Sequence, residues 1–362
     1  MEIGVITNPN SRKNRAKPNR AAELQAVVGG LGEVHATPNV EAIKPVAREF
    51  LRRRARFWVA DGGDGALHWL VRAGLELLEE KEFRDTGVSL PLTLPTNGGT
   101  IDFVAHHVGI RGDAHSLLRE LRAALERGEA IEEVEVDSMC IDGVRIDGGR
   151  EVSFRTYGFA SAAGGVGQRF YSKYYADDDP SPKTILKVVS KTVASMPIAL
   201  SPLRRMPGLP ESMKQYARDL FRPTEARVEL DGELLPGVAY TGIHIAAMSI
   251  DLGGVFRFFG KADEPGCLHA LVGEVSPLTI LRNLPRMHLG KELRGANVID
   301  RACRVMTIEA AGREHLDPII DGEYYRGVRR LTFSLGPRVR IPKIRADLAS
   351  QIRPPAAPRA VA

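Results

Sequence analysis

The spacing of apolar residues changes near residue 135, and this change constrains the fold more than any other feature of the chain. Before it, short apolar runs alternate with helical patterns. The runs cover residues 3–7, 57–60 and 91–95, and the helical patterns cover 19–28 and 66–80. Such alternation predicts a parallel sheet with helices on its faces. After residue 135 the period shortens to about two residues, with Asp-Gly turns, which predicts antiparallel hairpins.

The two patterns predict two domains, and 362 residues are enough for both. We expect an α/β domain over residues 1–135 and a β-rich domain over 136–342. Inside the second domain a basic helical insertion is expected at about 182–223. The Pro- and Ala-rich residues 343–362 are expected to form a tail.

The composition is that of a folded protein, with 43% hydrophobic and 26% charged residues. A net charge of +5 is compatible with nucleic acid, an anionic membrane or a phosphorylated substrate, and does not choose among them. Cys140, Cys267 and Cys303 are odd in number and lack metal-ligand spacing, which argues against a disulfide framework or a zinc site. No signal peptide or membrane span is visible, so we expect a cytoplasmic enzyme.

A glycine-rich loop, VADGGDGA at residues 59–66, follows the apolar run at 57–60. Glycines let backbone amides approach a ligand and adopt positive φ, and the following helix N-terminus favours phosphate. An ordinary strand-to-helix turn also favours Gly and Asp. Two further polar loops, TNPNSRKN at 7–14 and PTNGGTID at 95–102, follow other predicted strands. Because ligands bind at the carboxyl ends of parallel strands, the three loops together favour a nucleotide site.

Four motifs in this order resemble the diacylglycerol kinase catalytic-domain family, which includes bacterial lipid kinases, sphingosine kinases and ceramide kinases. They are Asn8-Pro9-Asn10-Ser11, Gly62-Gly63-Asp64-Gly65, Gly98-Gly99-Thr100-Ile101-Asp102-Phe103 and Ile320-Asp321-Gly322-Glu323. The resemblance runs from the first strand to about residue 342. The GGDG loop alone is shared with NAD kinases, so an NAD-kinase-like enzyme is the alternative activity.

The resemblance implies a Rossmann-like, parallel-sheet nucleotide-binding domain followed by an antiparallel β-sandwich domain. It implies a lipid kinase that uses ATP and magnesium. Asp102 would hold magnesium through water or orient its loop, while Asp321 or Glu323 would accept the proton of the lipid hydroxyl, with Asp64 as the third candidate. The implied ATP-binding residues are Asn8, Asn10, Ser11, Thr37, Gly62, Gly63, Asp64, Gly65, Ala66, Asn97, Gly98, Gly99 and Thr100.

Three positions depart from the family pattern. Ala66 replaces a Thr, Ile101 replaces an Asn, and Pro265 interrupts the acidic turn that contributes to a structural magnesium site in the bacterial lipid kinases. These departures leave a non-catalytic nucleotide- or lipid-binding relative as a further alternative. A second tripeptide, Asp231-Gly232-Glu233, repeats the late motif, and we expect it to be a plain hairpin.

The basic insertion bears on the partners. Lys183, Lys187 and Lys191 recur every four residues and therefore share a helix face. Such a face can rest on anionic lipid, although a solvated surface has the same pattern. The aromatic residues Phe170, Tyr171, Tyr174 and Tyr175 are expected in the core. The expected partner is a lipid and not a nucleic acid, at the inner face of the membrane or in the cytoplasm; a homodimer is compatible with the sequence.

Overall fold

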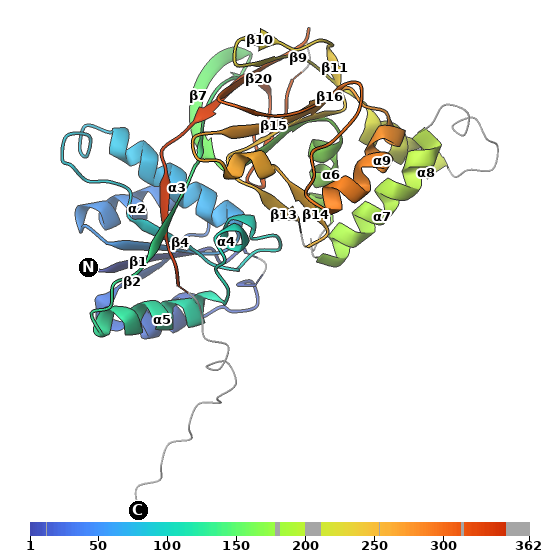
Figure 1. The fold of residues 1–362 in the computed structure, drawn as a ribbon. Helices are drawn as coiled ribbons and strands as arrows, with labels where there is room; N and C mark the ends of the chain where they lie inside the picture. Colours follow the sequence, from blue (N-terminus) through green and yellow to red (C-terminus); the bar gives the residue numbers. More distant parts are fainter. Residues whose placement is uncertain (12, 178–181, 200–210, 253, 313–314, 345–362) are drawn as a thin grey trace, which may run out of the picture. The chain divides into compact units, whose positions relative to one another are not determined.

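The computed structural model describes residues 1–11, 13–177, 182–199, 211–252, 254–312 and 315–344 (Figure 1). The chain divides into two compact units. The first contains Met1–Glu135 and the C-terminal segment from Arg340, and the second contains Val136–Val339. Residues 345–362 of the predicted tail and 200–210 of the predicted insertion lie outside the described residues.

The first unit contains a parallel sheet with the strand order β2-β1-β3-β4. Its strands are β1 (Ile3–Thr7), β2 (Gly32–Ala36), β3 (Phe57–Asp61) and β4 (Leu92–Pro95). Helices α1 (Arg20–Val28) and α5 (Ala114–Glu126) pack together on one face, and α2 (Ile43–Arg52) and α3 (Asp64–Glu79) on the other (Figure 1). The unit also contains η1 (Gly29–Leu31), α4 (Phe103–His107) and all but one residue of each of the paired strands β5 (Glu133–Val136) and β21 (Val339–Pro342).

Burial on both faces explains the sequence of the central strands. Every residue of β1 and β3 is buried, because helices cover the sheet on both sides. Helix α2 contributes Ile43, Ala47, Phe50 and Leu51, an apolar stripe at helical spacing. A Cβ at Gly4 would lie 2.6 Å from the Phe50 ring, so the glycine lets α2 pack close to β1.

The second unit is built from two antiparallel sheets. The order of one is β10 (Glu233–Leu234), β9 (Thr224–Leu230), β17 (Val305–Ala310), β20 (Val328–Leu335), β6 (Met139–Asp147) and β7 (Arg150–Gly158), with β11 (Ala239–Tyr240) beside β9. The order of the other is β16 (Val298–Cys303), β15 (Leu268–Gly273), β12 (Gly242–Ala246), β8 (Ala160–Gly164), β18 (Ile319–Ile320) and β19 (Glu323–Tyr324).

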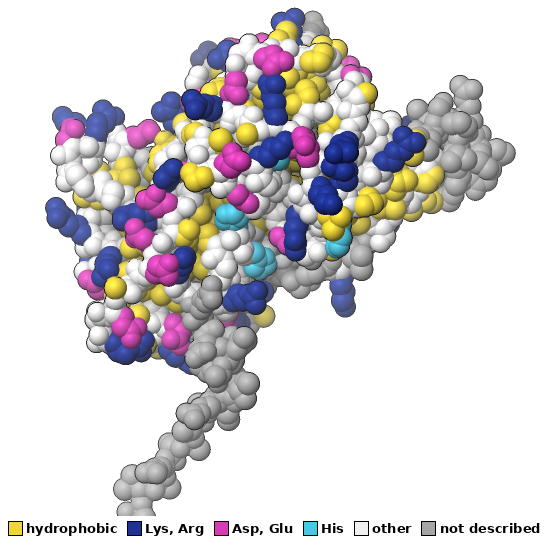
Figure 2. Space-filling view, in the orientation of Figure 1, with side chains coloured by type: hydrophobic (Ala, Val, Ile, Leu, Met, Phe, Trp, Pro, Cys, Tyr) yellow, Lys and Arg dark blue, Asp and Glu magenta, His cyan; other side chains and the backbone are white. Residues whose placement is uncertain are grey.

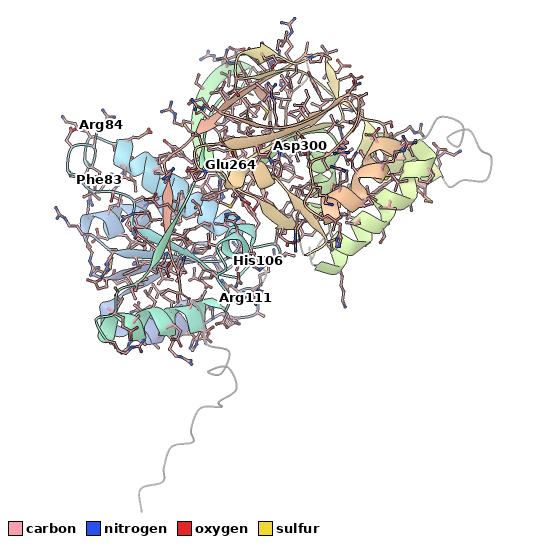
Figure 3. All side chains as sticks on the ribbon, viewed as in Figure 1. Phe83, Arg84, His106, Arg111, Glu264 and Asp300 are labelled. Carbon is pink, nitrogen blue, oxygen red and sulfur yellow. The ribbon has the colours of Figure 1, made fainter. Side chains whose placement is uncertain are left out.

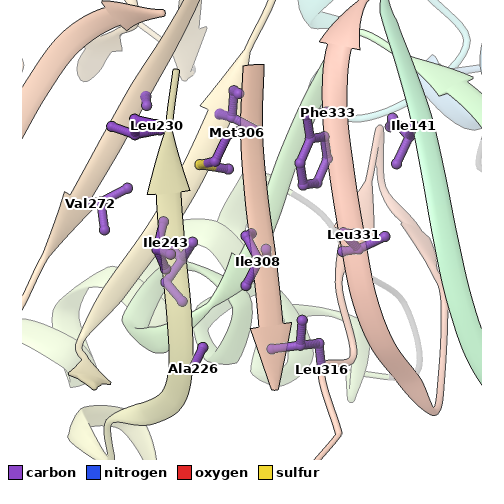
Figure 4. Close-up of a cluster of buried hydrophobic side chains, with 14 of the residues drawn as sticks. Ile141, Ala226, Leu230, Ile243, Val272, Met306, Ile308, Leu316, Leu331 and Phe333 are labelled. Atoms are coloured by element: carbon purple, nitrogen blue, oxygen red, sulfur yellow. The ribbon is translucent and has the colours of Figure 1, made fainter. Parts of the chain in front are cut away.

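The core of this unit lies between the two sheets (Figure 4). Leu230, Ile308 and Phe333 come from the sheet that contains β9, and Ile243 and Val272 come from the sheet that contains β12. Strand β9 alternates buried and exposed residues along its length, as one face of a sandwich requires. The predicted fold class, an α/β domain followed by an antiparallel β-sandwich, is therefore confirmed.

Helices cover one side of the sandwich. Helix α6 (Gly165–Tyr175) packs against β8 and β12, and α7 (Pro182–Ala199) packs against α8 (Glu211–Phe221) and α9 (Pro277–His288) (Figure 1). The remaining elements are η3 (Gly260–Asp263) and the paired strands β13 (Ile250–Leu252) and β14 (Phe256–Phe258). No helix within the described ranges combines the length and apolar character needed to cross a membrane.

Candidate functional site

The polar loops of the first unit meet at one edge of its sheet. Thr7 pairs in register with both Ala36 and Asp61, and Ala60 pairs with Pro95. The loops that follow β1, β2, β3 and β4 therefore begin side by side at the carboxyl ends of the strands. This arrangement brings together Asn8, Thr37, Gly62 and Asn97, which lie up to 89 positions apart in the sequence.

Two glycine loops pack backbone against backbone at this edge. The Gly98 N–H donates a hydrogen bond to the Gly62 carbonyl at 3.0 Å. A Cβ at Gly98 would lie 2.5 Å from the Gly62 carbonyl oxygen, and a Cβ at Gly63 would lie 2.7 Å from the Gly99 Cα. The expectation of positive φ is wrong, because Gly62, Gly63, Gly65, Gly98 and Gly99 all lie outside that region. Close approach of the two loops is what requires glycine here.

We expect Gly63→Val to weaken ATP binding by about tenfold or more, because its side chain must displace the Gly99 loop. Calorimetric titration with ATP measures the effect, and circular dichroism verifies the fold. Gly30→Val is the matched control, since a Cβ at Gly30 meets no atom within 4 Å. Affinity equal to that of the parent in Gly63→Val would place the nucleotide elsewhere.

A buried carboxylate fixes the positions of the loops after β1 and β3. Asp61 is fully buried and accepts hydrogen bonds from Thr7 Oγ1 at 2.7 Å and Asn14 Nδ2 at 3.1 Å. Arg20 donates through Nε at 3.0 Å and through Nη2 at 3.1 Å. Sequence reasoning missed this network, although Asp61 stands at the head of the DGGDGA loop. Arg20 and Asp61 lie far apart in the sequence, so no local pattern predicts that they form an ion pair.

Some polar atoms of these loops are hydrogen-bonded within the described part of the unit, and two buried oxygens are not. Asn10 N–H donates to Asn8 Oδ1 at 2.9 Å, and Asn10 Nδ2 donates to the Pro38 carbonyl at 2.8 Å. Ser11 Oγ and Asn97 Oδ1 are buried and have no hydrogen-bond partner among the described residues. Buried polar atoms are nearly always hydrogen-bonded, so these two oxygens mark places for water or a ligand.

A cation that sequence reasoning missed joins two of the loops. Lys13 Nζ donates a hydrogen bond to the Asn97 carbonyl, so an exposed ammonium group stands between the loops after β1 and β4. The basic pair inside TNPNSRKN was the available signal. An ammonium group at this edge suits a phosphorylated ligand.

Among the other predicted ATP-binding residues of this edge, Thr37 and Ala66 have contacts within the unit. Thr37 is buried, and its N–H donates to the Thr7 carbonyl at 2.9 Å. Ala66 is buried in the first turn of α3, where a Cβ at Gly62 would lie 2.5 Å from its own Cβ. Thr100 is half-buried. The alanine therefore packs closely on the backbone of the glycine loop.

Asp64 and Asp102 both bind backbone amides. Asp64 accepts from the N–H groups of Phe103 and Val104 at 3.2 and 3.4 Å. Asp102 has a φ of 50°, and its Oδ1 accepts from the Gly99 N–H at 2.8 Å. Burial raises the pKa of Asp102, against the opposing effects of the Gly99 hydrogen bond and the nearby Lys13 charge. Of the two roles expected for Asp102, its geometry favours orientation of the loop.

Asp64 and Asp102 do not form a magnesium site made of protein ligands alone. Nowhere in the described ranges do three or more His, Cys, Asp or Glu residues form a group that could hold a metal ion. Mg²⁺ commonly keeps several waters and binds one or two carboxylates together with phosphate oxygens. The residues present are therefore compatible only with a magnesium ion that is bound mainly by water and nucleotide phosphate, for which Asp64 or Asp102 would supply a carboxylate.

In the second unit, the two Asp-Gly-Glu tripeptides form hairpins with the same backbone. Asp321 and Gly322 have φ values of 49° and 91°, and Asp231 and Gly232 have values of 51° and 84°. Glutamate follows in both, and the flanking residues pair directly, Ile320 with Glu323 and Leu230 with Glu233. Positive φ at both central residues is the signature of a type I′ turn, which Asp-Gly favours.

Both aspartates fasten their hairpin to a neighbouring strand. The Asp321 carboxylate accepts from the N–H groups of Phe159 at 3.0 Å and Ala160 at 2.8 Å. Asp231 accepts from those of Arg304 at 2.8 Å and Val305 at 2.9 Å. The aspartate of each tripeptide therefore has the same structural role.

Burial and ion pairing separate the two hairpins. Asp321 is only 4% exposed, whereas Asp231 is exposed. Glu233 is exposed and pairs with Arg301 at 2.8 Å. Glu323 is half-buried, and its carboxylate has no hydrogen bond or ion pair with the described residues. The late hairpin thus presents an unpaired, partly desolvated carboxylate, and the early one does not.

Aromatic side chains of α6 pack against the late hairpin. A Cβ at Gly322 would lie 2.8 Å from Tyr175 Oη, and the rings of Tyr175 and Tyr324 are 6.0 Å apart. Tyr324 Oη donates to Ser172 Oγ at 3.0 Å. The expectation of a core position holds for Tyr174, which is buried, but is wrong for Tyr175, which is exposed. The hairpin is therefore bordered by partly exposed aromatic surface.

The turn around Pro265 is held by backbone contacts. Asp263 Oδ1 accepts from the Ser249 N–H at 3.0 Å, and the Gly266 N–H donates to Asp137 Oδ2 at 2.7 Å. Glu264 is exposed after η3, and Asp300 lies on β16 (Figure 3). Asp300 accepts a hydrogen bond from His269 Nε2 at 2.8 Å. The carboxylates of Asp263 and Asp300 thus stabilise the unit itself.

No protein-family model matches the chain, and no curated protein is similar to it in sequence. Its fold is similar to that of three solved structures from Bacillus anthracis str. Sterne. A candidate diacylglycerol kinase has a TM-score of 0.61 at 13% identity over 96% of this chain and 98% of that one. A diacylglycerol kinase has a TM-score of 0.55 at 12% identity, over 96% and 97%.

The third structure, another candidate diacylglycerol kinase, has a TM-score of 0.58 at 14% identity, over 92% of this chain and 94% of that one. Each similarity extends over nearly the whole of both chains. The two-domain fold of this chain is therefore the fold of these proteins.

Proposed function

We propose that this chain is an ATP-dependent lipid kinase that phosphorylates a lipid hydroxyl, as in diacylglycerol, ceramide or a sphingoid base, with Glu323 as the proton acceptor. The observation that carries the proposal is the environment of Glu323, a half-buried carboxylate without a partner among the described residues. The fold shared with a diacylglycerol kinase supports a kinase over other activities.

The loops of the first unit suit ATP. Their closely packed glycines hold two of the loops together, and Ser11 Oγ and Asn97 Oδ1 are buried oxygens without a partner in the described part of the chain. Helix α3 begins at Asp64, and a helix N-terminus favours the negative charge of phosphate. Lys13 adds a cation at the same edge. A bound magnesium ion neutralises phosphate charge during transfer.

Glu323 suits the proton transfer better than Asp321. The Asp321 carboxylate already accepts hydrogen bonds from the N–H groups of Phe159 and Ala160, so its oxygens are engaged in holding the hairpin. Glu323 has no such contacts among the described residues. In the proposed reaction Glu323 takes the proton of the lipid hydroxyl. The lipid oxygen then bonds to the γ-phosphorus, and the bond between that phosphorus and the bridging oxygen of ADP breaks.

The test is incubation of the purified protein with γ-labelled ATP and each of diacylglycerol, ceramide, a sphingoid base and NAD, the lipids in detergent micelles. We expect label in one of the lipids. Label in NAD would instead establish the NAD-kinase-like alternative. ATP binding without transfer to any acceptor would indicate the non-catalytic relative and reject the proposal.

A further inference from the structure

Helix α9 of the second unit has a polar residue inside and leucines outside. Asn283 is 4% exposed, and its Nδ2 donates to the carbonyls of Thr279 at 2.8 Å and Arg294 at 2.7 Å. Its Oδ1 accepts from the Arg294 N–H at 2.9 Å. Leu278 and Leu281, in contrast, are 38% and 39% exposed. Amphipathic helices of a globular protein show the opposite arrangement.

The exposed apolar residues extend past the end of the helix. Leu289 is 58% exposed, and Val255, before β14, is 51% exposed. His288 Nδ1 donates to the Val255 carbonyl at 2.8 Å, which holds Val255 beside the C-terminus of α9. We call Val255, Leu278, Leu281 and Leu289 the α9 surface. Single exposed leucines need no explanation, but a group of them on one helix and its neighbouring turn indicates a docking surface.

Cations flank the α9 surface. Residues 277–294 contain four Arg or Lys residues and one Glu. Arg282, Lys291 and Arg294 are exposed, and their side chains have no carboxylate partner among the described residues. Figure 2 shows hydrophobic side chains gathered over the region of α7, α8 and α9, with Lys and Arg side chains beside them. The charge of the surface is therefore complementary to an anionic partner.

The neighbouring helix α7 extends the basic character. Lys183, Lys187 and Lys191 are exposed on α7, as the sequence predicted. Lys187 Nζ lies 3.4 Å from Asp177 Oδ2, an exposed pair that removes little of the charge. Since α7 packs against α9, basic residues lie on both helices of this side of the sandwich.

We propose that the α9 surface docks on an anionic lipid membrane. The leucines would enter the boundary between headgroups and acyl chains, while Arg282, Lys291 and Arg294 face the lipid phosphates. The cations of this surface have no carboxylate partner among the described residues, and their single sign is complementary to the phosphates of an anionic membrane. The docking proposal does not depend on the proposed function. Only the further statement that docking brings a kinase to its lipid substrate rests on that function.

The test is co-sedimentation of the full chain with vesicles of phosphatidylcholine alone or of phosphatidylcholine with phosphatidylglycerol, without ATP. We expect the parent to bind the anionic vesicles, more strongly at low salt. Leu278→Gln with Leu281→Gln should lower the partition coefficient by about tenfold, because two leucines no longer enter the bilayer. Leu234→Gln with Val238→Gln is the matched control, since these side chains are 64% and 57% exposed away from α9.

Three results would overturn the docking proposal. The first is equal vesicle binding by the parent and the α9 double variant, and the second is no vesicle binding by the parent. The third is a dimeric parent and a monomeric double variant in analytical ultracentrifugation, with vesicle binding intact, which would make the surface an interface between copies. The kinase assay uses lipid in detergent micelles and needs no vesicle. If the parent phosphorylated no lipid in that assay, the proposed function would be rejected whatever the result of the vesicle experiment.

Discussion

Glu323→Gln is expected to lower the rate of lipid phosphorylation by about 10²- to 10⁴-fold, the usual contribution of a general base. Glutamine preserves the size of the side chain but cannot accept the proton of the lipid hydroxyl. Because Glu323 lies in the second unit, outside the loops that suit ATP, ATP affinity should be retained. The measurements are initial rates with the lipid that the acceptor panel identifies, and calorimetric titration with ATP.

The chain contains a matched control for this prediction. Glu233 occupies the same position of the same type I′ hairpin, but it is exposed and paired with Arg301. Glu233→Gln should therefore leave the rate close to that of the parent. Equal loss in the two variants would mean that the tripeptide matters for structure and not for proton transfer. A parent-like rate in Glu323→Gln would return the role of base to Asp321 or Asp64.

Arg20→Met is expected to lower the free energy of unfolding of the first unit by about 3–5 kcal/mol, because it leaves a buried charge without its partner. Asp61 is fully buried, and two nitrogens of Arg20 bind its two carboxylate oxygens. Urea denaturation followed by tryptophan fluorescence measures the effect. Both tryptophans of the chain, Trp58 and Trp69, lie in the first unit, so the signal reports this unit.

An exposed ion pair of the same unit provides the comparison. Arg52 Nε lies 2.6 Å from Glu82 Oε1, and its side chain is 55% exposed. Arg52→Met should change the free energy of unfolding by no more than about 1 kcal/mol, as is usual for surface pairs. If the two variants lost the same stability, the Asp61 network would contribute no more than a surface contact. ATP binding by Arg20→Met shows in addition whether the network positions the loops.

The sequence alone predicted the features that depend on local spacing. Alternation of strand and helix patterns before residue 135 predicted the parallel sheet, and the period of two after it predicted antiparallel strands. Parallel strands end at a common edge, so the meeting of the loops that contain Asn8, Gly62 and Asn97 also followed from the sequence. In each case the signal is the spacing of residue types along the segment itself, which shows whether the segment is a helix or a strand.

Features that depend on distant residues had to come from the tertiary structure. The glycines of the DGGDGA loop were expected to let amides approach a ligand and to adopt positive φ, but a Cβ at Gly63 would meet the Gly99 backbone. The partner of Asp61 is Arg20, 41 positions away, and no local pattern connects them. A pattern of residue types reports the conformation that a segment prefers, and not which other segment will pack against it.

The two Asp-Gly-Glu tripeptides separate these contributions most clearly. The Asp-Gly dipeptide favours a type I′ turn, and both tripeptides form one, although Asp142-Gly143 of the same chain lies inside strand β6. Only the fold decided that Glu233 is solvated beside Arg301 while Glu323 is half-buried and unpaired among the described residues. Burial and ion pairing depend on strands brought together from elsewhere in the chain, and they decide which of two identical motifs has its glutamate paired with a cation and which, in the described part of the chain, does not.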